Sequence, residues 1–137
     1  MNPELKVIIF DEKDKLKDLL KLLDEQYDLV INKELIKLDK IARDLDEAAK
    51  ELARIEIRRR KIMGSDTSMK QTIENCDDTS IQEAYEDIKS TLKMIEIQKE
   101  ANDILIKQKL FFTKKMINFI KPNKGVATYN SSGQVGK

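Results

Sequence analysis

Apolar residues recur every three or four positions along most of the chain, which is the period of an amphipathic α-helix. The first repeat consists of Leu5, Ile9, Leu16, Leu19, Leu23 and Val30. Continued past Val30, its phase would place charged residues on the apolar stripe, which a buried face does not tolerate without partners. A second repeat begins one position later, with Ile31, Leu38, Ile41, Leu45, Ala48, Leu52, Ile55 and Ile62. The pattern predicts a helix over about residues 3–31, a tight turn near 31–34, and a helix over about 34–63.

Residue types that favour helix ends stand close to these limits. Pro3 suits a first helical turn, because the N–H that proline lacks has no helical partner there. Asn32 stands at the join between the two repeats and is a candidate N-cap for the second helix. Gly64 follows the last periodic residue and is a candidate C-cap. These signals support both helices.

The next segment, residues 65–80, is polar and rich in turn-forming residues. Ser68 followed by Gln71 forms a capping-box pattern. We therefore predict a short helix over about 68–76 within the 64–80 connection. The residues that would face inward on it are Met69, Ile73 and Cys76.

A third long repeat opens at a second capping box, Ser80 to Glu83. Its members are Ile81, Tyr85, Ile88, Leu92 and Ile95, and it continues to Ile106 and Ile120. Pro122 ends the helical pattern, so we predict a helix over about 81–121. Three polar residues interrupt the repeat, and such residues fix the register of a helix or face solvent. They are Lys99, Asn102 and Lys109.

These elements predict an all-α protein built as an antiparallel, coiled-coil-like bundle of three long helices. We expect a bundle domain over 1–121, followed by a flexible C-terminal tail over 122–137. The tail is rich in Gly, Ser and Asn and has no core-forming pattern. It does contain one aromatic residue, Tyr129.

Residues 104–121, called here the C-terminal apolar segment, are more apolar than bundle packing requires. On a helical wheel their apolar side chains spread over roughly 260°, whereas a core-facing stripe needs about 100° or slightly more. The excess predicts a second face that binds a partner's helix or closes a homodimer, and both readings stay open. The candidate partner-binding residues are Leu105, Phe112, Met116 and Phe119.

Composition agrees with long solvated helices: charged residues make up 37% of the chain, and Gly and Pro together number six. Net charge is +1, but the last acidic residue is Asp103, and residues 104–137 hold seven lysines and no acid. The first 103 residues therefore carry 19 basic and 25 acidic side chains, a balance of −6. Such an asymmetry indicates a partner contacted at the basic end, or simply a solvated lysine face.

The chain has no histidine and one cysteine, Cys76, which cannot form an internal disulfide. We expect a reducing, cytoplasmic setting, with no signal peptide and no stable membrane insertion. No Gly-rich phosphate loop, Cys/His cluster or catalytic Ser/His/Asp set is present, so we predict a non-enzyme without cofactor or metal. The basic run at 58–61 complements a helix C-terminus, and arginine is absent beyond residue 60, so no nucleic acid partner is expected.

The order of these elements resembles the FlgN family of flagellar type III export chaperones over nearly the whole chain. Asn102-Asp103-Ile104-Leu105 is similar to the family's Asn-x-x-Leu in the last helix. Thr128-Tyr129-Asn130-Ser131-Ser132-Gly133 is similar to its Thr-Tyr-x-x-x-Gly tail. Asn32 is a weaker match, because the family often has an acidic residue at the start of its second helix.

The resemblance implies a cytoplasmic chaperone without nucleotide or metal. It would bind the C-terminal helices of hook-associated (hook–filament junction) proteins, prevent their premature assembly, and deliver them to the export gate. It also implies that Tyr129 docks to the gate's membrane-anchored component. The alternative that the residues leave open is a non-enzymatic coiled-coil adaptor or a homodimeric structural protein.

Overall fold

A computed structural model describes residues 1–64 and 68–120, and at positions 111–114, 116, 117, 119 and 120 it describes the backbone alone. The described chain is helical and contains no strand. The helices are α1 (Pro3–Ile31), α2 (Leu35–Met63), α3 (Met69–Glu74) and α4 (Thr79–Ile120). The chain divides into two compact units at residues 102 and 103, inside α4.

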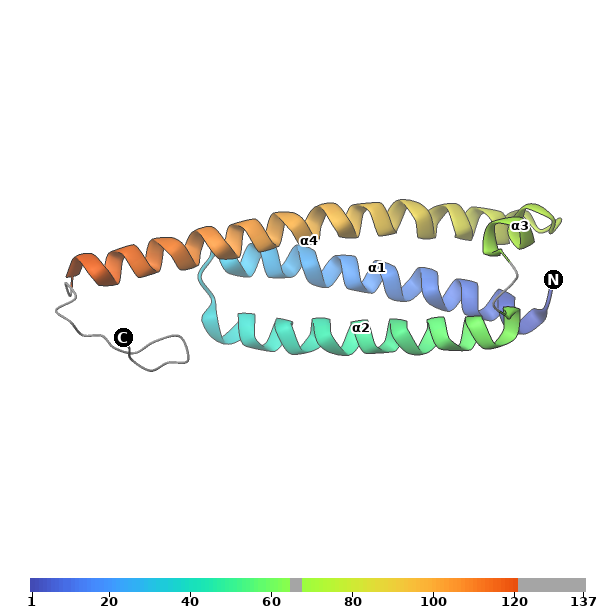
Figure 1. The fold of residues 1–137 in the computed structure, drawn as a ribbon, viewed down its shortest axis with the longest axis horizontal. Coiled ribbons are helices and arrows are strands. Elements are labelled where there is room, and N and C mark those ends of the chain that lie inside the picture. The colour runs from blue at the N-terminus through green and yellow to red at the C-terminus, as the bar shows by residue number, and fades with distance from the viewer. Residues whose placement is uncertain (65–67, 121–137) are drawn as a thin grey trace. The chain divides into compact units, whose positions relative to one another are not determined.

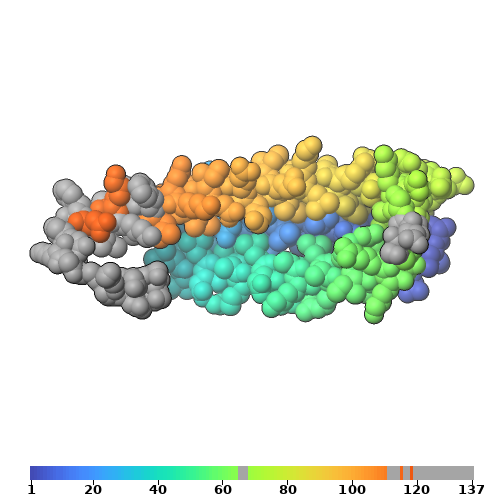
Figure 2. Space-filling model, in the orientation of Figure 1, coloured from blue at the N-terminus to red at the C-terminus, as the bar shows by residue number. Residues whose placement is uncertain are grey.

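The first unit, residues 1–102, is a bundle of three long helices. α1 and α2 form an antiparallel hairpin, and the α4 residues of this unit run antiparallel to α2 and parallel to α1 (Figure 1). In the space-filling view the surface of α1 is visible between α4 and α2 (Figure 2). The predicted all-α bundle with a short helix in the 64–80 connection is confirmed.

The core of this unit joins three of the four helices, with partly buried residues of α2 packed against it. Its fully buried members are Leu5, Ile9, Leu16 and Leu23 of α1, Ile73 of α3, and Ile81, Ala84, Ile88 and Ile95 of α4. Partly buried residues that pack on this cluster include Leu45, Leu52 and Ile62 of α2. Each buried leucine or isoleucine of this cluster stabilises the fold by about 1.5–3 kcal/mol relative to exposure.

The stripe predicted for α4 differs from the observed one at Leu92 and at Ile106, of which Ile106 is 37% exposed. Leu92 is 45% exposed, whereas Thr91 beside it is buried. The buried side of α4 follows alternating steps of three and four residues through Ala84 and Thr91, and Leu92 falls one position outside it. Similarly, Ile8 is buried beside the predicted Ile9, while Ile31 at the end of α1 is 46% exposed.

The turn between α1 and α2 corrects the role predicted for Asn32. Asn32 ends α1, and its N–H donates to the carbonyl of Asp28 at 2.9 Å. Lys33 follows in the left-handed region with φ of 57°, and α2 begins after Glu34, which makes no side-chain capping bond. Asn32 is therefore the C-cap of α1 rather than the N-cap of α2, because its backbone N–H completes the last turn of α1.

Two further helix ends are capped by the residues predicted for them. Gly64 ends α2 as predicted, with φ of 80° and its N–H donating to the carbonyl of Arg60. Ser68 caps α3 as predicted, and its hydroxyl oxygen accepts from the N–H of Gln71 at 3.3 Å.

The N-terminus of α4 differs from the prediction that placed the cap at Ser80. The carboxylate of Asp78 accepts both the N–H of Ser80 at 3.0 Å and its hydroxyl at 2.7 Å. The helix accordingly begins at Thr79, because a carboxylate is an effective N-cap and it precedes Ser80 in the chain.

Candidate partner-binding surface

The α4 helix carries a buried seam through the first unit. Its buried members are Ile81, Ala84, Ile88, Thr91, Ile95 and Asn102. The steps between them are three or four residues, with one step of seven past Gln98, which is half-buried. This is the spacing by which a helix keeps one face against a neighbour. The seam of the first unit thus ends on a polar residue.

Asn102 is 1% exposed and is fully hydrogen-bonded. Its amide nitrogen donates to the backbone carbonyl of Leu23 at 2.8 Å and to the side-chain carbonyl of Gln26 at 2.9 Å. Its own side-chain carbonyl accepts from the amide of Gln98 at 2.9 Å. A buried amide satisfied in this way selects one register of α4 against α1, since any shift would leave it unpaired.

The three predicted interruptions of the stripe therefore have two different roles. Asn102 is buried and fixes register, whereas Lys99 and Lys109 are exposed. The difference follows from side-chain length, because a long lysine side chain carries its charge to solvent while asparagine holds its amide close to the backbone. The asparagine of the Asn-x-x-Leu pattern thus joins α4 to α1 by hydrogen bonds.

In the second unit, the described side chains of the C-terminal apolar segment are mostly exposed. Ile104, Ile106 and Leu110 are 49%, 37% and 55% exposed, and Leu105 is half-buried. The side chains of Phe112, Met116 and Phe119, and all of Tyr129, lie outside the described residues. The structure thus shows exposed apolar surface in this segment and leaves most of the predicted binding residues undescribed.

In the sequence, the spacing of the buried seam continues into the C-terminal apolar segment. Further steps of three and four residues from Asn102 reach Leu105, Lys109, Phe112, Met116 and Phe119. All four partner-binding residues predicted within the C-terminal apolar segment are therefore in phase with the buried seam of α4.

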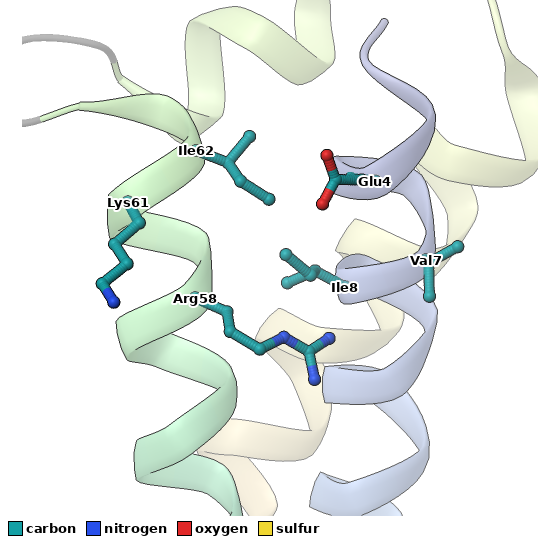
Figure 3. Close-up of a pocket in the computed structure, with 6 residues that line it drawn as sticks. All are labelled: Glu4, Val7, Ile8, Arg58, Lys61 and Ile62. Atoms are coloured by element: carbon teal, nitrogen blue, oxygen red, sulfur yellow. The ribbon is translucent and has the colours of Figure 1, made fainter.

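A shallow pocket of about 370 Å³ lies between the first turns of α1 and the last turns of α2 (Figure 3). Ile8 of α1 and Ile62 of α2 point toward each other across it, and the Glu4 carboxylate and the Arg58 guanidinium lie at its edges. Arg58 also pairs with Asp11 at 3.3 Å. Sequence analysis missed this pocket, because its residues come from helix ends about fifty positions apart in the chain and share no motif.

The pKa values of two interacting carboxylates, Glu12 of α1 and Glu56 of α2, are shifted in opposite directions. Burial raises the pKa of Glu12, and the charge of Glu56 raises it further. The pKa of Glu56 is lowered, chiefly by its hydrogen bond from Arg59, which also donates from Nε to Glu56 Oε1 at 3.1 Å. Arg60 donates to the same carboxylate at 3.2 Å. This group is an ion-pair network in which Glu56 is neutralised by two guanidinium groups.

Among the residues that the structure describes, no three His, Cys, Asp or Glu side chains are placed to hold a metal ion. Within the same residues, no helix combines the length and apolar character needed to cross a bilayer.

The chain matches the family described as FlgN protein over residues 1–137, its whole length. It belongs to the FlgN family. The comparisons with curated proteins and with solved structures gave no match. FlgN proteins are flagellar export chaperones and not an enzyme family, so membership assigns this FlgN chain the general role of a chaperone in flagellum biogenesis, with flagellar proteins as partners.

Proposed function

We propose that this FlgN protein binds the C-terminal helices of hook-associated proteins in the cytoplasm, keeps them from assembling, and delivers them to the export gate. The observation that carries the proposal is the exposure of the apolar side chains of Ile104, Ile106 and Leu110 on the C-terminal apolar segment of α4. A partner's amphipathic helix buries such side chains by helix packing, in which apolar anchors repeat every three or four residues.

The contact residues in this proposal are Leu105, Phe112, Met116 and Phe119. Aromatic anchors at protein interfaces can each contribute about 2 kcal/mol or more, which corresponds to roughly thirtyfold in affinity. Replacing Phe112 and Phe119 by Ala should therefore weaken binding of a hook-associated protein strongly, while far-ultraviolet circular dichroism stays close to that of the wild type.

Ile36→Ala provides a control, because Ile36 is 88% exposed on α2 and its substitution likewise removes an apolar side chain. Calorimetric titration of each variant with the purified cargo gives the affinities. Binding that is unchanged in the Phe112/Phe119 variant, or a variant that unfolds, would overturn this assignment of the interface.

The adaptor or homodimer alternative makes a different prediction about partners. A chaperone purified from its native cell should bring down a hook-associated or other flagellar axial protein. An adaptor would bring down proteins outside the flagellum, and a homodimeric structural protein would bring down only its own copies.

Tyr129 is the residue that we propose for docking to the export gate. A single aromatic side chain can enter a pocket on the gate while the helices hold cargo, which gives a contact that is weak enough to release. Tyr129→Ala should leave fold and cargo binding unchanged and weaken capture by the cytoplasmic domain of the gate component. Tyr129→Phe separates the ring from the hydroxyl. Equal gate affinities for wild type and Tyr129→Ala, measured with cargo bound, would remove Tyr129 from the mechanism.

A further inference from the structure

The first described turns of the C-terminal apolar segment combine exposed apolar residues with exposed lysines. Ile104, Ile106 and Leu110 are 49%, 37% and 55% exposed. Lys107 and Lys109 are exposed as well. Single exposed apolar residues are common on proteins, but several on successive turns of one helix form a surface that a ligand can cover.

Two of these apolar side chains lie between the two lysines. Ile106 and Leu110 are four residues apart, so they lie on one side of the helix, about 40° from each other. Lys107 lies about 60° beyond Leu110 on one edge, and Lys109 lies about 60° beyond Ile106 on the other. A lysine side chain can cover apolar surface with its methylene groups while its ammonium group reaches the polar side of an interface.

The charge of the segment is of one sign only. Residues 104–121 hold five lysines and no acidic residue, and residues 122–137 add two more lysines. A helix that combines apolar surface with lysines in this way is typical of helices that lie in the interface of a bilayer. There the apolar side chains enter the boundary of the acyl region, and the ammonium groups contact anionic headgroups.

The width of the apolar surface also favours a bilayer as its ligand. Apolar side chains of this segment spread over roughly 260° of the helical wheel, which is more than one partner helix covers. A fluid bilayer interface fits such a surface without a matching groove. We propose that, in the absence of cargo, the C-terminal apolar segment lies on an anionic membrane surface, with Ile106 and Leu110 in the acyl boundary and Lys107 and Lys109 at the lipid phosphates.

This contact is peripheral, because the segment lies on the surface of the bilayer and does not cross it. Its strength should rise with the fraction of anionic lipid and fall as salt screens the lysines. The proposal concerns the chain without cargo. It does not depend on cargo or gate binding, since the experiments that test it use only this chain and lipid.

Vesicle flotation tests the proposal on the full chain. The vesicles contain phosphatidylcholine alone or with about one quarter phosphatidylglycerol, which makes the surface anionic. In low salt the chain should bind the anionic vesicles at least about tenfold more tightly than the neutral ones, and added salt should reduce this difference. A chain that does not bind the anionic vesicles, or that binds both kinds equally, would overturn the proposal.

Paired substitutions locate the contact on α4. Ile106→Ser/Leu110→Ser removes the apolar pair and should weaken binding at least about tenfold, because interfacial affinity scales with the apolar area buried. Met94→Ser/Ile97→Ser is the matched control. It removes two side chains of the same helix that are 54% and 66% exposed, and it should leave binding unchanged. An equal loss of binding in the two variants would contradict the assignment.

Reversal of one lysine charge tests the edge of the apolar pair. Lys107→Glu should weaken binding to anionic vesicles about tenfold, because it places an acid beside the headgroups. Lys93→Glu is the control, since Lys93 is an exposed lysine of the same helix and the change in net charge is equal. Its effect should be much smaller. Equal effects would show attraction by net charge alone and would overturn the placement of this segment on the membrane.

A single tryptophan reports whether the apolar pair enters the acyl boundary, because the chain has no tryptophan of its own. On anionic vesicles the emission of Leu110→Trp should shift to shorter wavelength. Brominated acyl chains should quench it severalfold more strongly than they quench Ile97→Trp, whose position is 66% exposed. Equal quenching of the two reporters would exclude insertion and overturn the proposal. Circular dichroism of each variant confirms that the bundle is intact.

Discussion

Truncation of Asn102 tests whether the polar end of the α4 seam fixes the bundle register. In Asn102→Ala the side-chain amide is lost, together with its bonds to the Leu23 carbonyl, to Gln26 and to Gln98. We expect the bundle to remain folded but to lose stability, since two of these contacts join α1 to α4, across 79 and 76 positions of sequence.

The magnitude follows from the three hydrogen bonds. Each contributes about 1 kcal/mol net, so their sum is about 3 kcal/mol. Gln26 and Gln98 are half-buried and can recover part of this from water, and alanine gains about 0.6 kcal/mol of helix propensity over asparagine. The expected loss in free energy of unfolding is therefore about 2 kcal/mol, roughly a thirtyfold change in the folding equilibrium.

Urea unfolding at 25 °C measures this loss, with Asn118→Ala as the control. Asn118 is an exposed asparagine on the same helix, so its substitution reports propensity without the buried hydrogen bonds. A difference between the two variants below about 0.5 kcal/mol, the typical limit for surface substitutions, would refute a stabilising role for the Asn102 contacts.

Three further variants probe the helix ends and the charges. Gly64→Ala should cost about 1 kcal/mol in urea unfolding, because φ of 80° strains any residue with a Cβ although no atom lies within 4 Å of it. Asp78→Asn keeps a cap but loses the Lys6 ion pair of 2.6 Å, which chiefly holds the pKa of Asp78 below its usual range. That contribution is present above about pH 4 and is lost as pH falls, so this variant should be less stable at pH 7 and converge with wild type in strong acid. Glu12→Gln should have the opposite effect on stability at pH 7, because burial and then Glu56 raise the pKa of Glu12. The protonated form is favoured in the fold, so the variant should be more stable than wild type at pH 7 and equal to it near pH 4. For either variant, a stability equal to that of the wild type at pH 7 but different from it in acid would contradict the assigned direction of the pKa shift.

Periodicity alone predicted the helices well, because each long helix buries one face over many turns. Pro3 and Gly64 mark helix ends through backbone chemistry that is independent of tertiary context. Asn32 and Ser80 were assigned wrongly for the opposite reason. Each has a competing neighbour, and the path of the turn decides which residue caps which helix.

Sequence reasoning could identify Asn102 as an interruption of the stripe but could not identify its partners. Nothing in the sequence marks the backbone carbonyl of Leu23 as the acceptor of a side-chain hydrogen bond. Only the register of α4 against α1 brings this carbonyl and Asn102 together. Thr91 and Leu92 show the same limit, since a shift of one position on the wheel decides which of them is buried. Hydrophobicity alone favoured the leucine.

The charges of the C-terminal apolar segment favour one class of partner helix. Beyond Asp103 every charged residue is a lysine, so two copies of the C-terminal apolar segment repel each other while an acidic partner helix is attracted. Under the proposed function, cargo selection then depends on the acidic flanks of the partner helix as well as on its apolar stripe. The uniform positive charge thus disfavours pairing of two copies through the surface on which Ile104 and Leu110 are exposed.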